Sequence, residues 1–461
     1  MIALPPTDTE SVCPVCLARL PARRVAEGDE IYLVKSCPEH GEFKTILWRG
    51  LESYRRWGER GSRAAVPPVT QTPVQRGCPH DCGLCPEHRQ HTCCVLLEVT
   101  SRCNLRCPVC FASAGGADED PSPAQIDSWL RLLRAHGNPV NIQLSGGEPT
   151  LRDDLPAIVG RVRAAGFDFV QLNTNGIRLA REPDYVENLA QAGLDCVFLQ
   201  FDGVTNEVFQ RIRGARLLET KKRAILRCAE AGIGVVLVPT LVPGVNVGEI
   251  GAIIDFALAR VPAVRAVHFQ PVSYFGRYPV PPADGDRITL PEVMGELERQ
   301  SGGTIRAADF APGSAENAYC SFTGKFFVGA NGRLRAAEAA ADGCCTPSTG
   351  CGCGLPPAGE DAQRARRFVA GQWAAESAPI AAAEPAYVNV ASFDAFLAAR
   401  RHAFSISAMA FQDAWNLDLE RLRECFIHVV APDRRIVPFC AYNLTSTAGE
   451  SLYRPLAAEY A

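Results

Sequence analysis

Three cysteines on one short segment have the clearest chemical potential in this chain. Cys103, Cys107 and Cys110 follow the spacing CxxxCxxC. Each iron of a [4Fe–4S] cluster normally takes one thiolate, so three thiolates would leave the fourth iron without a protein ligand. An open iron can chelate the amino and carboxylate groups of a small molecule. A zinc knuckle completed by a distant fourth cysteine is the alternative, which the apolar strand pattern before the segment disfavours.

A second cysteine group precedes the first. Cys78, Cys82 and Cys85 are followed by Cys93, and these four thiolates would satisfy all the irons of an auxiliary [4Fe–4S] cluster. Such a cluster would relay electrons and bind no cofactor. Cys94 adjoins Cys93 and could replace it, but we favour Cys93 because Cys94 begins an apolar run. Zinc on the same four thiolates is the alternative.

The third group lies near the amino terminus. Cys13 and Cys16 form one pair, and Cys37 with His40 forms another about twenty residues later. Three thiolates and one imidazole suit tetrahedral zinc, as in a zinc ribbon, or iron, as in a rubredoxin-like site. Such a site can fold a domain too small to build its own core. We expect a structural or docking role.

A predicted hairpin near the end of the chain carries two of its last cysteines. If residues 431–434 form a type I turn, with Pro at its second position, Val430 pairs with Arg435. Counting outward, Cys425 then faces Cys440 directly across the ladder. Two opposed thiols could share a metal, join a further cluster or form a redox disulfide.

Cys320 would supply a third ligand to a possible third cluster. The fourth could come from a Gly-rich loop that holds Cys344, Cys345, Cys351 and Cys353. That loop could instead bind a soft metal or pass electrons. The sequence does not decide between these roles.

The elements that must position these groups follow a regular alternation. Short apolar runs predict strands at Val95–Val99, Val140–Leu144, Phe167–Leu172, Cys196–Phe201, Val235–Val238 and Ala266–Phe269. Helices are predicted between them at Pro123–Ala135, Asp153–Ala165, Tyr185–Ala192, Glu219–Ala231 and Val247–Ala259. The alternation predicts parallel strands with right-handed crossovers. Six repeats indicate a partial (β/α)6 barrel, an α/β fold, with its active groups at the carboxyl ends of the strands.

The barrel is expected to span residues 95–300, with other regions on either side. Residues 1–50 form the metal knuckle around a strand at Ile31–Lys35, and residues 51–94 form a linker and the auxiliary-cluster segment. Residues 301–461 form a Cys-rich C-terminal α+β region. Its first hairpin is predicted around Asn331-Gly332, a strong two-residue turn signal.

The composition of the chain limits which partners and which cellular compartment we expect for it. The chain has 461 residues, 20 cysteines and a net charge of -4, with no basic block that would suggest nucleic acid. No apolar run approaches the ~20 residues of a membrane span, and no signal peptide is visible. We therefore expect a cytoplasmic protein whose clustered thiols bind metal. Cys196 and Cys228, alone in apolar runs, are expected in the core.

These motifs together resemble the radical SAM superfamily. Ser145–Thr150 is similar to the GGEP motif of that family, Asn173–Gly176 to its ribose-contacting segment, and Gln200–Gly203 to its fourth-strand contact. The resemblance implies that S-adenosylmethionine binds the open iron. It implies cofactor contacts at Phe111, Gly146, Gly147, Glu148, Asn173, Asn175, Gln200 and Asp202. Any one of the Asn or Gln residues could instead cap a helix.

One branch of the superfamily is especially similar, that of tetraether lipid synthase and uncharacterised bacterial relatives. The shared segments are Gly77–His88, Gln90–Cys93 and Cys103–Ala112, and the likeness covers roughly residues 10–280. It implies an auxiliary cluster and radical C–C bond formation or alkylation at an unactivated carbon. Past residue 300 the match fails.

The resemblance implies a transferase-like radical SAM enzyme. The reduced cluster would cleave S-adenosylmethionine to a 5′-deoxyadenosyl radical, which abstracts hydrogen from a small-molecule or lipid substrate. The electron donor would be a reductant such as flavodoxin or ferredoxin. A peptide- or protein-modifying maturase is the alternative. His268, Gln270 and Tyr274 are candidate polar groups late in the barrel, and no base is assigned.

Overall fold

The computed structural model describes residues 5–59, 63–115, 119–329, 332, 334–337, 359–375 and 402–454. The four cysteines of the Gly-rich loop, Cys344, Cys345, Cys351 and Cys353, lie outside the described residues. Within the described parts, no helix is both long and apolar enough to cross a membrane.

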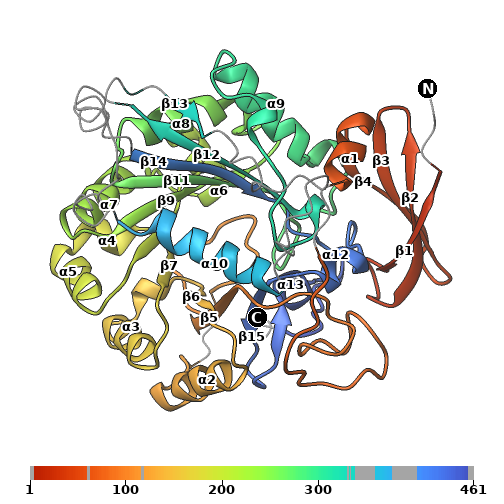
Figure 1. Cartoon of the computed structure of the whole chain (residues 1–461), viewed down its shortest axis with the longest axis horizontal. Coiled ribbons are helices and arrows are strands. Elements are labelled where there is room, and N and C mark those ends of the chain that lie inside the picture. Colours follow the sequence, from red (N-terminus) through yellow and green to blue (C-terminus); the bar gives the residue numbers. More distant parts are fainter. Residues whose placement is uncertain are drawn as a thin grey trace, which may run out of the picture.

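The amino-terminal region is a four-stranded antiparallel meander (Figure 1, red and orange). Its elements are β1 (Thr7–Val12), β2 (Arg19–Glu27), β3 (Glu30–Cys37), β4 (Gly41–Arg49) and the helix α1 (Leu51–Gly58). Alternate residues of β3, among them Ile31 and Leu33, are buried, which is the period of a half-buried strand. Trp48 of β4 packs against Trp57 of α1, with ring centroids 6.0 Å apart.

Six parallel strands form the predicted partial barrel, each hydrogen-bonded to the next. They are β5 (Cys94–Thr100), β6 (Asn141–Gly146), β7 (Val170–Thr174), β8 (Cys196–Gln200), β9 (Gly234–Val238) and β11 (Val264–Pro271). The short strand β10 (Thr240–Leu241) pairs with β11. Most residues of these strands are buried, because helices cover the outer face and the inner face lines the interior of the barrel. The prediction of a partial (β/α) barrel is confirmed.

Helices connect the strands and lie around the sheet (Figure 1). They are α2 (Pro123–Ala135), α3 (Leu155–Ala164), α4 (Ile177–Arg181), α5 (Pro183–Gln191), α6 (Asn206–Arg213), α7 (Leu218–Glu230), α8 (Ile250–Leu258) and α9 (Leu290–Gln300). Short 3-10 turns occur at η1 (Pro149–Leu151), η2 (Val247–Glu249), η3 (Asp284–Asp286), η4 (Ala307–Asp309) and η5 (Ala318–Cys320). Helix α2 begins as predicted, because Ser122 and Gln125 form a capping box and Pro123 takes the first helical position.

The C-terminal region adds strands to both edges of the barrel sheet. At one edge β14 (His402–Met409) lies parallel to β11, followed by antiparallel β12 (Ser321–Val328) and β13 (Leu334–Ala336). At the other edge β15 (Ile427–Val430) lies parallel to β5, followed by antiparallel β16 (Ile436–Pro438). The first predicted hairpin therefore exists as β12 and β13. Two short helices, α12 (Leu419–Arg423) and α13 (Phe439–Asn443), flank β15 and β16.

The predicted register of the second hairpin is wrong by one residue. Val430 pairs with Ile436, and the Ala431 N–H donates to the Arg435 carbonyl at 2.8 Å. The reason is that Arg434 has a φ of 69°, so the turn ends in a left-handed residue and a bulge. Cys440 then falls in α13 and does not face Cys425 across the ladder.

Helix α10 (Glu360–Trp373) packs across the amino-terminal ends of several barrel strands (Figure 1, light blue). The Asn141 side chain at the start of β6 donates to the Arg366 carbonyl at 3.1 Å. The Trp373 indole donates to the Ser405 hydroxyl of β14 at 3.3 Å. At the start of β9, a Cβ on Gly234 would overlap the Trp373 carbonyl oxygen. The helix therefore covers the amino-terminal end of the barrel.

Candidate active site

The CxxxCxxC cysteines follow β5 and line a cavity of about 900 Å³ that extends into the barrel. Burial, with smaller contributions from the nearby Glu148, Cys110 and Cys107 side chains, raises the pKa of the Cys103 thiol to about 11, although the Leu105 N–H lowers it. Three thiolates this close together would repel one another without a metal. Cationic iron would remove that repulsion and stabilise their ionised form. The donor set therefore fits a cluster, with the cavity adjacent to any iron that lacks a thiolate.

A loop after β11 fixes the backbone of the cysteine loop. Arg277 exchanges two backbone hydrogen bonds with Cys110, at 2.9 and 3.0 Å, and its Nε donates to the Cys107 carbonyl at 3.2 Å. Gly276 has a φ of 54°, and a Cβ there would crowd the carbonyl oxygens of Cys110 and Phe111. Glycine is therefore needed for this close approach.

The two glycines after β6 bring that strand end against the cysteine loop. A Cβ at Gly146 would overlap the Thr100 carbonyl oxygen, and one at Gly147 would overlap that of Arg102. With no Cβ in the way, the Gly147 N–H donates to Thr100 at 2.8 Å. The glycines thus have a visible role in packing against the cysteine loop, in addition to the predicted opening toward a cofactor.

The Glu148 carboxylate joins the ends of β6 and β7. It accepts from the Thr174 hydroxyl at 2.6 Å and from the Asn175 N–H at 2.7 Å, and it is 1% exposed. The Asn175 amide in turn donates to the Asn104 side chain of the cysteine loop at 2.7 Å. Residues of the Gly-Gly-Glu segment, of the Asn173–Gly176 segment and of the cysteine loop are therefore joined by one set of hydrogen bonds.

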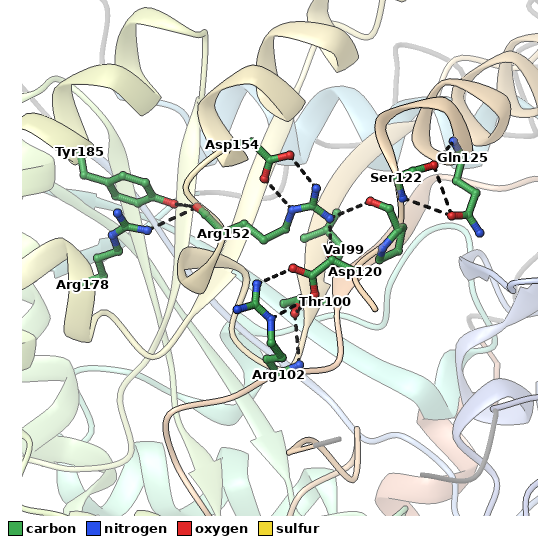
Figure 2. Close-up of polar contacts among 11 residues, drawn as sticks. Val99, Thr100, Arg102, Asp120, Ser122, Gln125, Arg152, Asp154, Arg178 and Tyr185 are labelled. Atoms are coloured by element: carbon green, nitrogen blue, oxygen red, sulfur yellow. Dashed lines mark hydrogen bonds and ion pairs between the residues drawn. The ribbon is translucent and has the colours of Figure 1, made fainter. Parts of the chain in front are cut away.

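Figure 2 shows a further set of contacts around Val99, Thr100 and Arg102, where β5 ends and the cysteine loop begins. The Arg152 guanidinium pairs with Asp154 at 2.6 Å and donates to the Val99 and Pro121 carbonyls, both at 2.8 Å. Beside it, the Thr100 hydroxyl donates to Asp120 at 2.5 Å. These bonds tie the last residues of β5 to the segments before α2 and α3. They fix the point from which the cysteine loop leaves the sheet.

Asp202, predicted to contact a cofactor, lies behind another residue. Its carboxylate is fully buried and holds the Arg213 guanidinium at 2.7 and 2.6 Å. Arg213 lines the cavity, and so does Gln200. The Gln200 amide is oriented with its oxygen toward Arg213 and accepts a hydrogen bond from that guanidinium at 3.0 Å. Burial lowers the pKa of Arg213, but Asp202 and the Cys107 side chain together raise it above its ordinary value. Arg213 is thus a permanent cation near the cysteine loop.

The remaining predicted contacts divide into those that reach the cavity and those that do not. Those that line it are Phe111, Gly146, Gly147, Glu148, Asn173, Asn175, Gln200, His268 and Gln270. Tyr274 faces elsewhere, because its hydroxyl donates to the Asp286 carbonyl at 2.9 Å.

The Phe111 ring lies 5.8 Å from Phe439, which lies 4.4 Å from Phe411. Sequence reasoning missed these two C-terminal rings.

Three cysteines of the auxiliary segment gather beside the C-terminal region. Cys78 and Cys82 are buried in one apolar group, and the Cys82 N–H donates to the Tyr453 hydroxyl at 2.9 Å. The Cys78 side chain and burial raise the pKa of the Cys82 thiol, with Cys85 contributing. Cys93 lies in a different apolar group, and its N–H donates to the Phe426 carbonyl at 2.8 Å. Its place as the fourth ligand stays a prediction.

The C-terminal cysteines gather although they are not opposed in the hairpin. The Cys320 sulfur accepts from the Arg421 guanidinium at 3.6 Å, and the Cys440 sulfur accepts from the Gln412 N–H at 3.3 Å. Burial raises the pKa of the Cys440 thiol, and the neighbouring Cys425 and Cys320 raise it further. The Cys320 and Cys425 thiols therefore lie close enough to Cys440 for their charges to affect its ionisation.

The amino-terminal meander holds a four-ligand group. The ligand atoms of Cys13, Cys16, Cys37 and His40 all lie within 4.8 Å of one another. Three sulfurs and one imidazole nitrogen at this spacing fit a tetrahedral zinc ion. The meander is joined to the C-terminal region by an ion pair between Arg24 and Asp418 at 2.6 Å. The site therefore supports a domain that packs on the rest of the protein.

Removing one ligand of this group should unfold the meander. We expect Cys37→Ala to lose one bound zinc per chain and to lower the thermal midpoint, because the metal supplies much of the folding free energy of so small a domain. His40→Cys keeps four ligands and is expected to retain the metal. Zinc content and thermal unfolding of both variants test this. Equal zinc content in Cys37→Ala and the wild type would contradict it.

Comparison with known proteins agrees with this geometry. A family model described as the radical SAM superfamily matches residues 97–257, and one described as the HMPTM N-terminal zinc ribbon domain matches residues 5–49. The second match confirms the predicted zinc ribbon.

Relatives extend the likeness over nearly the whole chain. The chain is 36% identical to 7,8-dihydro-6-hydroxymethylpterin dimethyltransferase of Methanocaldococcus jannaschii, over 94% of this chain and 93% of that protein. It is 34% identical to Fe-coproporphyrin III synthase of Methanosarcina barkeri, over 45% of this chain and 49% of that protein. Among solved structures, SuiB of Streptococcus suis aligns with 47% of this chain and 46% of its own, at 18% identity and a TM-score of 0.36. From the cysteine loop, the partial barrel and the near full-length relative, it follows that this chain belongs to the radical SAM superfamily.

Proposed function

We propose that this enzyme uses radical chemistry to alkylate, or form a C–C bond at, an unactivated carbon of a small molecule held inside the barrel. The observation that carries this proposal is the cavity of about 900 Å³ that reaches from the cysteine loop into the interior of the sheet. It has room for S-adenosylmethionine and for part of a second molecule.

Cys103, Cys107 and Cys110 would hold the cluster, and the open iron would take the methionyl amino and carboxylate groups. When bound, the cluster and S-adenosylmethionine supply the one-electron cleavage that gives a 5′-deoxyadenosyl radical. The protein binds and orients these groups. Arg213, a buried cation on the cavity wall, would balance the cofactor carboxylate. The Phe111 and Phe439 rings offer an apolar surface for the adenine.

The auxiliary and C-terminal cysteine groups would move electrons to this site. We propose an auxiliary [4Fe–4S] cluster on Cys78, Cys82 and Cys85, with Cys93 as the predicted fourth ligand. Cys320, Cys425 and Cys440 would hold a third cluster. A low-potential reductant such as flavodoxin or ferredoxin would be the donor.

The relative from M. jannaschii suggests a first substrate to test. Its name says that it dimethylates 7,8-dihydro-6-hydroxymethylpterin. A lipid, suggested by the likeness to tetraether lipid synthase, is the second candidate. A peptide- or protein-modifying role stays a prediction.

Anaerobic reconstitution tests the proposal. With a strong reductant, we expect the protein to convert S-adenosylmethionine to 5′-deoxyadenosine and methionine, and to do so faster with the true substrate. With the dihydropterin, one further S-adenosylmethionine per methylation would donate the methyl group and leave as S-adenosylhomocysteine, with the added reductant supplying the electron. Because each methyl group replaces a hydrogen, the expected product is heavier by one or two CH2 units. Mass spectrometry would detect both. Failure to form 5′-deoxyadenosine from fully loaded protein would rule the proposal out.

Iron analysis counts the clusters in the same preparation. Three clusters give about twelve iron atoms per chain and two give about eight. Cys85→Ala and Cys425→Ala should each lower the count by about four if they belong to separate clusters. No loss in Cys425→Ala would remove the third cluster from the proposal.

A further inference from the structure

The cavity continues below the predicted cofactor layer into the amino-terminal half of the barrel. Asn141 and Gln143 of β6 and Gln171 of β7 line it there, and we call these three residues the amide floor. Helix α10 closes this end and contributes Phe368 and Trp373 to the lining. The amide floor lies outside every motif that identified the superfamily.

Two oxygens of the amide floor are buried without a partner. Oδ1 of Asn141 and Oε1 of Gln171 accept no hydrogen bond from any described residue, although these side chains are 1% and 2% exposed. Gln143 and Gln171 are register partners on adjacent parallel strands, so their side chains extend into the barrel side by side. Buried polar groups are nearly always satisfied, and a barrel interior is normally filled by apolar residues. The unpaired oxygens therefore indicate a ligand with N–H donors.

The walls beside the amide floor carry aromatic rings, and the Lys325 ammonium lies 4.6 Å from the centre of the Phe368 ring. The Phe198 ring lies 5.1 Å from Trp373 and 5.4 Å from His268. Burial lowers the pKa of His268 to about 4, so this imidazole is neutral near pH 7, and its Nδ1 is hydrogen-bonded to the Ser407 hydroxyl at 2.9 Å. A charged ligand group would find no counter-ion among Asn141, Gln143 and Gln171.

The depth of this part of the cavity fits a substrate and not the cofactor. Along β7, four residues separate Gln171 from Asn175, which lies in the predicted cofactor layer. At ~3.3 Å per residue, Gln171 lies about 13 Å below Asn175 and about 7 Å below Asn173, the other residue of this strand end that is predicted to contact the cofactor. A molecule bound there would point its other end toward the cysteine loop.

We infer that the amide floor binds the polar edge of the substrate, and that this substrate is a planar heterocycle with a lactam or amidine edge. Its N–H groups donate to the Asn141 and Gln171 oxygens, and its ring lies against the aromatic wall. The reacting carbon is then at the end nearer the cysteine loop. This inference rests on the proposed function, whose substrate class it specifies.

A pair of probes of equal size tests the inference. 2-Amino-4-oxopteridine has a lactam edge, and 2-naphthylmethanol is a planar bicycle without one. Binding is measured by anaerobic calorimetry on reconstituted protein with S-adenosylmethionine present. The wild type is expected to bind the pteridine at least about tenfold more tightly than the naphthalene, since a buried hydrogen-bonding site discriminates strongly against an analogue that cannot pair.

Substitutions then locate the contact. Gln171→Leu is expected to weaken pteridine binding at least about tenfold and to leave naphthalene binding within about twofold. Gln143→Leu is a second variant, in case the first fails to fold. Gln191→Leu, the same change on an exposed position of α5, is the control and should bind like the wild type.

Two outcomes would overturn the inference. One is equal pteridine affinity in the wild type and in both floor variants. The other is a wild type that binds the naphthalene as tightly as the pteridine, which would indicate a merely apolar cavity. Formation of 5′-deoxyadenosine by the wild type without any probe is measured separately. Its absence would reject the proposed function, whereas a failed floor test with normal cleavage would reject only the substrate class.

Discussion

Cys107→Ala is expected to reduce the cleavage of S-adenosylmethionine by at least about 1,000-fold. The cysteine loop offers three thiolates to the cavity, and each would hold one iron, so the loss of one removes an anchor that the loop itself cannot replace. A loss of that size corresponds to about 4 kcal/mol of transition-state stabilisation. The measurement is the rate of 5′-deoxyadenosine formation after anaerobic reconstitution.

Cys228→Ala is the matched control for this prediction. Cys228 lies on α7, is 1% exposed and packs in the apolar core away from the cavity lining. It should lose little activity and keep the wild-type iron content. If Cys107→Ala kept both its iron and its activity, the assignment of the cysteine loop to the cluster would be wrong.

Asp202→Asn is expected to raise the KM for S-adenosylmethionine by about 10- to 100-fold and to lower the free energy of unfolding by about 3 kcal/mol. Asp202 is fully buried and holds Arg213 by two hydrogen bonds. Removing one partner of a buried pair leaves the other charge uncompensated, which typically costs about 3–5 kcal/mol. The Arg213 guanidinium would then lose its fixed direction on the cavity wall.

A double variant separates stability from cofactor binding. Asp202→Leu with Arg213→Met replaces the pair by apolar side chains, which is often neutral or stabilising. We expect this variant to recover most of the unfolding free energy while its KM for S-adenosylmethionine stays high. Thermal unfolding and steady-state kinetics of both variants are the measurements. A double variant with a wild-type KM would show that Arg213 has no part in holding the cofactor.

The barrel was predictable because its signals are local. Each strand is a short apolar run buried on both faces, and the helices carry their own start signals, such as Ser122, Pro123 and Gln125 before α2. The CxxxCxxC spacing and the Gly-Gly-Glu segment are also local patterns. The sequence therefore located the cysteine loop and most residues that line the cavity near it.

The features that were missed depend on distant segments or on one unusual residue. Nothing near Arg213 in sequence indicates its ion pair with Asp202, and Phe411 and Phe439 come from the far end of the chain. The hairpin register failed because Arg434 adopts a left-handed conformation that favours glycine, and non-glycine residues rarely signal it. A single such residue shifts every cross-strand pair that follows.

The pairing of β5 with β15 has a consequence for biosynthesis. About 330 residues separate the strand that carries the cysteine loop from its neighbour at the edge of the sheet. At roughly 5–20 residues per second, β5 leaves the ribosome some 15–65 s before β15 is made. During that interval one side of β5 lacks its backbone partners and is open to aggregation. Iron–sulfur loading that depends on a fully paired β5 is therefore expected only after β15 has been made, and chains cut short before residue 427 should accumulate as insoluble, iron-free protein.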